Sequence, residues 1–221
     1  MAEKNSYRVI AIDGPAASGK SSVARELARR LGFVYVNSGA MYRAVTWAVL
    51  NRGIEPQNKE AITRFITNVN LDGIFIEREF HLLIDNVDLT SHLHEEQVNA
   101  EVSRVSTVVE VRNRLVQRMR DSAEDHDLII EGRDIGSVVF PETPYKFYID
   151  ASPDVRARRR AAQGQRDQIA QRDLADSSRA ASPLVVAKDA QVIDTSDMSI
   201  YEVVDEIVKC LFAKGFSDLA S

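Results

Sequence analysis

Residues 14–21 of the chain read Gly14-Pro15-Ala16-Ala17-Ser18-Gly19-Lys20-Ser21, which matches the pattern G-x-x-x-x-G-K-[ST]. Glycines in such a loop let backbone N–H groups curl around a phosphate, and the positive end of the following helix points at the same anion. We therefore expect this loop, together with Ser22, to bind the phosphates of ATP. Lys20 would reach the β- and γ-phosphates, and the Ser21 hydroxyl would ligate Mg²⁺, the expected cofactor.

Apolar patterning on both sides of the loop predicts an α/β fold. Residues 7–12 are typical of a buried parallel strand, and residues 19–31 of a helix whose apolar side chains recur every four positions. A second strand over residues 33–36 would complete a βαβ unit, and Ser38 would cap the next helix. The other expected core elements are strands over residues 128–130, 145–149 and 192–194 and helices over residues 109–122 and 200–212, and a further helix is expected over residues 95–106.

A segment with a different pattern interrupts this alternation. After a helix-like stretch over residues 59–69, with Asn58 as its N-cap, come short β-prone pieces spaced as in an antiparallel ribbon. The 221 residues suit one domain with insertions better than two independent domains. We expect a core of approximately residues 7–37, 108–155 and 180–221, an insertion over residues 38–107, and an arginine-rich lid over residues 156–179.

Composition and charge narrow the range of partners. The formal net charge of -5 argues against non-specific binding to nucleic acid or to an anionic membrane. No apolar stretch is long enough to span a bilayer, and the N-terminus shows no apolar leader segment. The single cysteine, Cys210, is expected in the core and fits a reducing compartment. A cytoplasmic monomer is therefore predicted, because neither coiled-coil heptads nor an exposed apolar stripe is evident.

Two further polar motifs follow expected strands. Residues 38–43 read Ser38-Gly39-Ala40-Met41-Tyr42-Arg43, and residues 131–136 read Glu131-Gly132-Arg133-Asp134-Ile135-Gly136. Ligands of open parallel sheets gather beyond the carboxyl ends of the strands, so both motifs would face the phosphate loop across one crevice. With these motifs, the sequence closely resembles bacterial cytidylate kinases over roughly residues 9–211. The resemblance also includes Gln171-Arg172-Asp173, Asp176, Arg179, Ser182-Pro183-Leu184, Asp189-Ala190 and Ile193-Asp194.

This resemblance implies a P-loop NTPase fold, in which helices flank a parallel β-sheet. An α/β insertion with a small antiparallel sheet would bind the nucleoside monophosphate, and a short helical lid would close over ATP. The implied reaction is in-line phosphoryl transfer from ATP to CMP, and to dCMP, giving the diphosphate. By resemblance, the acceptor residues are Arg43, Arg133 and Arg179 for the phosphate, Ser103, Arg112 and Asp134 for cytosine, Ser38 and Tyr42 for the pocket lining, and Arg172 and Asp176 for the sugar. Lid residues Arg156 and Arg160 would contact ATP phosphates, so the implied catalytic set is Lys20, Arg133, Arg156, Arg160 and Arg179.

The chemistry of the residue types agrees with these implied roles. The amino group at N4 of cytosine suits a carboxylate such as Asp134, whereas uracil presents a carbonyl there. Cytosine N3 and O2 are acceptors and suit Arg112 and the Ser103 hydroxyl. A general base is not required, because the second ionisation of a phosphate monoester lies near pH 6. Catalysis would then consist of positioning and charge neutralisation.

Several alternatives remain open from the sequence. A kinase of the same fold could act on UMP, AMP or shikimate, and a nucleotide-binding switch would share the phosphate loop. The chain lacks the D-x-x-G motif of switches, and residues 58–61 lack the carboxylate of N-K-x-D. An RNA-binding role for the arginine-rich segment would call for interleaved aromatics, and residues 156–179 contain none. Tyr42 could instead be a core residue and Arg112 a surface arginine, and it is open which arginine of residues 158–160 points inward.

Overall fold

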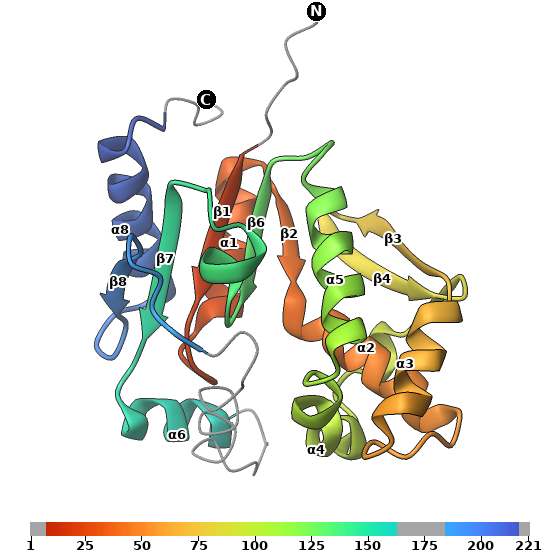
Figure 1. Ribbon diagram of the computed structural model, residues 1–221. Coiled ribbons are helices and arrows are strands. Elements are labelled where there is room, and N and C mark those ends of the chain that lie inside the picture. Colours follow the sequence, from red (N-terminus) through yellow and green to blue (C-terminus); the bar gives the residue numbers. More distant parts are fainter. Residues whose placement is uncertain (1–7, 163–183, 217–221) are drawn as a thin grey trace, which may run out of the picture. The chain divides into compact units, whose positions relative to one another are not determined.

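The computed structural model describes residues 8–162 and 184–216 (Figure 1). They fall into two compact units. The first comprises the chain up to Tyr35 and from Ala123 onward, and the second comprises Val36–Ser122. Among the described residues, no helix combines the length and apolar character needed to cross a membrane.

The first unit is built on parallel strands. Strand β1 (Val9–Asp13) lies between β6 (Leu128–Gly132) and β7 (Tyr145–Asp150), with Val9 opposite Leu128 and Ile10 opposite Tyr145. Strand β8 (Gln191–Asp194) pairs with β7, and β2 (Val34–Asn37) begins beside β6. Strand β1 is buried at every position, which explains the apolar run from Val9 to Ile12 that precedes Asp13.

Two helices pack together beside this sheet. Helix α1 (Lys20–Leu31) lies against α8 (Ile200–Ala213), and their apolar faces join the core with Ile10, Ile129 and Phe147. Helix α1 ends at Gly32, whose left-handed φ of 71° allows its N–H to bond to Ala28 O. Cys210 of α8, which the sequence predicted in the core, packs against this core and is partly buried.

Two shorter helices complete the first unit. A single turn of π-helix, η2 (Ile135–Val139), follows β6 directly, and α6 (Pro153–Ala162) follows β7. Both therefore begin at the carboxyl ends of strands, as does α1, and Figure 1 shows α6 beyond the lower end of β7. This edge of the first unit is where the phosphate loop lies.

The second unit contains the predicted insertion. Its helices are α2 (Ser38–Asn51), α3 (Lys59–Asn68), α4 (Glu96–Val105) and α5 (Val109–Ser122), with a short 3₁₀ helix η1 (Thr90–His92). The antiparallel ribbon is confirmed as β3 (Leu71–Ile76), β4 (Glu79–Ile84) and β5 (Val87–Asp88). Positive φ values at Glu77 and Arg78 form the tight turn between β3 and β4.

Three boundaries differ from the sequence-based expectations. The cap of α2 is Asn37 rather than Ser38, because Asn37 remains extended and its side chain accepts from Ala40 N at 2.9 Å. Glu131 is part of β6 instead of following it, because its backbone pairs with β1. The second unit extends through α5, beyond the expected end of the insertion at residue 107, since α5 packs on α3 and α2. Asn58 caps α3 as predicted, accepting from Ala61 N.

Candidate active site

The phosphate loop connects β1 to α1 and depends on glycine at two positions. Gly14 has a φ of 152°, and a Cβ there would lie 2.0 Å from Ile149 O. Gly19 adopts a φ of 99° immediately before α1. Both conformations disfavour an L side chain, so the glycine spacing in the sequence has a direct steric cause. The loop places the N-terminus of α1 where an anion is favoured.

Lys20 lies at this helix N-terminus and is almost fully buried. Its side chain folds back over the loop, and its Nζ donates to Pro15 O at 2.7 Å. An ammonium held against the loop adds a full positive charge to the partial charge of the helix. The contact of Lys20 with the β- and γ-phosphates stays a prediction.

Ser21 is bonded to a carboxylate that the sequence analysis did not select. Its Oγ donates to Glu131 Oε1 at 2.6 Å, and Tyr35 Oη donates to the same oxygen at 3.2 Å. Burial, together with the charge of Glu131, raises the pKa of Tyr35, so Tyr35 stays a neutral donor. Because Ser21 gives its proton to Glu131, its hydroxyl oxygen can serve as an acceptor or as a metal ligand.

This arrangement of oxygens fits Mg²⁺. Hydroxyl and carboxylate oxygens are hard ligands, and Mg²⁺ is usually held by one or two protein oxygens together with waters and substrate phosphates. In the described part of the chain, no group of three His, Cys, Asp or Glu side chains is arranged as a metal cage. One hydroxyl and one carboxylate are the kind of donor set that holds a Mg²⁺ ion bound also to a nucleotide.

A second unselected carboxylate, Asp13, fixes the backbone around Asp134. Its Oδ1 accepts from Ile135 N at 2.8 Å and its Oδ2 accepts from Gly136 N at 2.7 Å. Burial raises the pKa of Asp13 to about 6, although these two bonds act in the opposite direction. The two N–H groups directly follow Asp134, so Asp13 helps to orient the turn that carries it.

The predicted pair Arg133 and Asp134 lies in this turn, at the end of β6. Asp134 is buried, with 5% of its surface exposed, and its charge contributes to the raised pKa of Asp13. Arg133 is partly buried, and its Nη1 lies 3.4 Å from Gly132 O. The structure thus brings Asp134 close to Asp13 and places both predicted residues at the phosphate-loop edge of the sheet.

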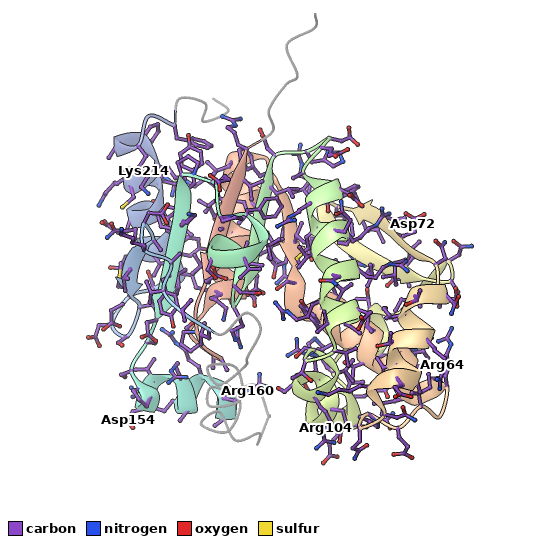
Figure 2. The ribbon with its side chains drawn as sticks, viewed as in Figure 1. Arg64, Asp72, Arg104, Asp154, Arg160 and Lys214 are labelled. Carbon is purple, nitrogen blue, oxygen red and sulfur yellow. The ribbon has the colours of Figure 1, made fainter. Side chains whose placement is uncertain are left out.

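Of the predicted lid residues, only those on α6 fall within the described chain. Arg156 Nε donates to Ala151 O at 3.1 Å, and its Nη1 lies 3.4 Å from Ala16 O of the phosphate loop. Arg160 is partly buried near the end of α6, where it is labelled in Figure 2. Arg172, Asp176 and Arg179 lie outside the described residues.

Arg159 answers the question that the run of arginines left open. Its Nη1 donates to Ser18 O at 3.0 Å and to Thr195 Oγ1 at 3.1 Å, while its Nη2 donates to Thr195 O at 2.8 Å. Neither Arg159 nor Thr195 was predicted from the sequence. For Arg159 the reason is that three adjacent arginines give no signal of which one turns toward the loop.

In the second unit, Ser38, Tyr42 and Arg43 lie in the first turns of α2. A Cβ on Gly39 would come within 2.9 Å of Arg43 Nη1, so the guanidinium folds back beside the N-terminal turn. The positive end of the helix dipole lies there, and an arginine at this position adds a fork of donors. The first turn of α2 is thereby suited to bind an anion, as predicted for the acceptor phosphate.

Arg112 of α5 is buried and lies beside Tyr42. Its exposed fraction is 5%, and its Cζ is 5.7 Å from the centre of the Tyr42 ring. Its neighbour Arg114 instead bonds the last carbonyls of α3, including Ile66 O at 2.8 Å. Arg112 is therefore not a surface arginine.

Ser103 lies on α4 and is partly buried. Its carbonyl oxygen accepts a hydrogen bond from Ser106 Oγ at 2.9 Å. Helix α4 packs against α2, which carries Tyr42, so the second unit gathers five of the ten predicted acceptor residues on neighbouring helices.

Comparison with known proteins gives a consistent result. The family profile described as "Cytidylate kinase" matches residues 10–212. A cytidylate kinase of Mycobacterium leprae (strain Br4923) is 43% identical over 212 residues, covering 90% of this chain and 93% of the relative. One of Pelotomaculum thermopropionicum is 42% identical over 217 residues, covering 92% and 96%. The solved structure of TT1252 from Thermus thermophilus shares the fold, with a TM-score of 0.50, 19% identity, and coverage of 94% and 97%.

Proposed function

The chain belongs to the cytidylate kinase family, and from this we propose that the loop at residues 14–21 and the turn at Asp134 catalyse ATP-dependent phosphorylation of CMP. The observation that carries the proposal is the geometry of the phosphate loop. Gly14 and Gly19 shape it, Lys20 lies buried over it, and Ser21 presents its hydroxyl beside Glu131.

The donor half of the reaction uses the phosphate loop. Its backbone N–H groups, with Ser22 in the first turn of α1, bind the β-phosphate of ATP, and Lys20 leaves Pro15 O to contact the β- and γ-phosphates. A Mg²⁺ ion held by Ser21 would neutralise charge on these phosphates. Arg156 and Arg160 add positive charge from α6, where charge develops during transfer.

The acceptor half uses arginines for phosphate and a carboxylate for the base. Arg43, Arg133 and Arg179 hold the CMP phosphate, and Ser38 and Tyr42 line the pocket. Asp134 accepts from the cytosine amino group, while Arg112 and Ser103 donate to its ring acceptors. Arg172 and Asp176 hold the sugar, and we propose that dCMP is accepted as well.

Phosphoryl transfer then needs no protein base. The CMP phosphate is largely a dianion near neutral pH, so its oxygen is already a nucleophile. The protein supplies alignment and electrostatic stabilisation instead. We further propose that the enzyme acts as a cytoplasmic monomer.

The first test mixes the purified protein with ATP, Mg²⁺ and each nucleoside monophosphate in turn, and measures ADP and the diphosphate product. We expect turnover of CMP and dCMP to exceed that of UMP and AMP. Preference for UMP or AMP would refute the base assignments, and ATP binding without any turnover would favour a nucleotide switch.

The role of Asp134 is tested by comparing CMP with UMP. Asp134→Ala should lower kcat/KM for CMP by about 10² or more and leave that for UMP nearly unchanged, because the lost bond is specific to the amino group. Asp125→Ala removes an exposed aspartate and serves as the matched control. Equal losses for CMP and UMP would show that Asp134 does not read the base.

A further inference from the structure

We propose that Arg159 and Thr195 are positioning residues of the phosphate loop, which set the direction of the Gly19 N–H by holding the carbonyl of the same peptide group. The inference deepens the proposed function and rests on it, since it concerns the proposed ATP site. Neither residue matches a motif that the sequence analysis used.

Two donors converge on one carbonyl oxygen of the loop. Arg159 Nη1 lies 3.0 Å from Ser18 O, and Thr195 Oγ1 also lies 3.0 Å from it. Ser18 and Thr195 are buried, with 0% and 2% of their surface exposed. Hydrogen bonds to a charged donor in a buried setting are stronger than those on the surface, so this carbonyl is firmly held.

The two donors also hold each other. Arg159 donates from Nη1 to Thr195 Oγ1 at 3.1 Å and from Nη2 to Thr195 O at 2.8 Å. Thr195 N in turn donates to Asp150 O at 2.9 Å, which anchors the pair to the end of β7. The Thr195 hydroxyl has one proton and two carbonyls within 3.0 Å, Ser18 O and Asp150 O. Arg159 therefore keeps Ser18 O bonded when the hydroxyl serves Asp150 O, and the hydroxyl oxygen in turn orients the Arg159 guanidinium toward Ser18 O.

Holding Ser18 O determines where the Gly19 N–H points. A peptide group is planar and trans, so its C=O and N–H point in opposite directions. Gly19 has a φ of 99°, and glycine at such a position could adopt other conformations at little cost. Fixing Ser18 O from outside the loop therefore selects the conformation in which the Gly19 N–H is available to phosphate. A Cβ on Gly19 would lie 3.5 Å from Arg159 Nη1, so the guanidinium also flanks the glycine.

The proposal predicts a specific defect in nucleotide binding. Arg159→Gln and Thr195→Val should each weaken ATP binding about tenfold, which is the loss expected for one hydrogen bond to a charged or buried group. The KM for CMP should change by less than about twofold, because Arg159 and Thr195 act only on the loop that binds ATP. Thr195→Ser keeps the hydroxyl and should restore near-normal binding.

The experiment measures ATP affinity by calorimetry without CMP, together with kcat and both KM values, on full-length protein. Arg158→Gln is the matched control, since Arg158 is an exposed arginine beside Arg159. In the double variant Arg159→Gln/Thr195→Val, the loss of ATP affinity should be clearly smaller than the product of the two single losses, because both side chains hold one carbonyl. Thermal unfolding above the assay temperature shows that each variant is folded.

Three results would overturn the proposal that Arg159 and Thr195 position the phosphate loop. Losses that multiply in the double variant would mean that the two residues act independently. A fall in kcat with unchanged ATP affinity in Arg159→Gln would mean that Arg159 contacts the transferring phosphoryl group directly. Wild-type ATP affinity in Thr195→Val would mean that the hydroxyl does not matter. Failure of the proposed function is distinguishable, because it would appear as an absence of CMP turnover in the unaltered protein.

Discussion

The carboxyl group of Asp13 should make the stability of this protein increase on mild acidification. Its pKa is raised from 3.8 to about 6 in the folded protein, mainly because the group is buried. The folded state therefore binds the Asp13 proton more tightly than the unfolded state does. The stabilisation from this proton is complete below the unfolded pKa of 3.8 and is lost as the pH rises through about 6.

The size of the effect follows from the pKa difference. Because one pKa unit corresponds to about 1.4 kcal/mol, the rise from 3.8 to about 6 corresponds to about 3 kcal/mol in total. About 2 kcal/mol of this should be gained between pH 7.5 and pH 4.5, where most of the difference in proton binding lies. Other carboxylates titrate in the same range, so the total stability of the protein does not report on Asp13 alone.

A non-titrating variant isolates the contribution of Asp13. We would measure the free energy of unfolding in urea for the unaltered protein and for Asp13→Asn at several pH values. The free energy of unfolding of the unaltered protein minus that of Asp13→Asn should become more positive by about 2 kcal/mol when the pH is lowered from 7.5 to 4.5. The comparison is then repeated with Asp134→Asn introduced into both the unaltered protein and Asp13→Asn. This control removes the titration of the neighbouring Asp134 carboxyl group from the difference. A difference that stays constant with pH would refute the reasoning.

Four further substitutions test three individual contacts. Lys20→Ala should reduce kcat by about 10² or more while far-UV circular dichroism stays unchanged, and near-normal turnover would contradict the role of the ammonium. Glu131→Gln should raise the Mg²⁺ concentration for half-maximal rate by about 10-fold, because the carboxylate orients the Ser21 hydroxyl, and an unaltered Mg²⁺ dependence would exclude this role. Lys146 Nζ is bonded to both oxygens of Asp189 at 2.8 Å, and the two side chains are 6% and 58% exposed. Asp189→Ala should therefore destabilise the protein in urea unfolding by about 2 kcal/mol more than Lys146→Met does, since only Asp189→Ala leaves a buried charge without its counter-ion. Equal losses of unfolding free energy in the two variants would refute this reasoning.

Local sequence patterns predicted the elements of the fold well. The phosphate loop, the cap at Asn58 and the antiparallel ribbon were predicted because each depends on residues close together in the chain. Helix α2 shows the limit of such patterns, since Asn37 and Ser38 are both good capping residues and only the backbone conformation separates them.

The supporting side chains of the site could not be selected in the same way. Asp13 bonds backbone groups 122 and 123 positions away, and Ser21 bonds a carboxylate 110 positions away. Such pairs form only when β1 and β6 lie side by side with Ile12 opposite Glu131. An acidic residue at the carboxyl end of the expected strand over residues 128–130 was the available signal for Glu131. For Arg159 and Thr195 the sequence contains no comparable signal.

The bonds made by Asp13 explain why a charge that reduces the stability of the fold is buried there. Asp13 at neutral pH carries a desolvation cost that an apolar residue would avoid, yet its two oxygens accept the N–H groups next to Asp134. An apolar side chain would leave both N–H groups without this acceptor, and the turn could then take other conformations. The same logic applies to Arg159, which holds Ser18 O rather than a ligand. At this edge of the sheet, the charged side chains of Asp13 and Arg159 fix backbone groups of the chain. Those backbone groups and their neighbours are the ones proposed to bind ATP and CMP. A site built this way should be sensitive to changes at residues that no substrate contacts.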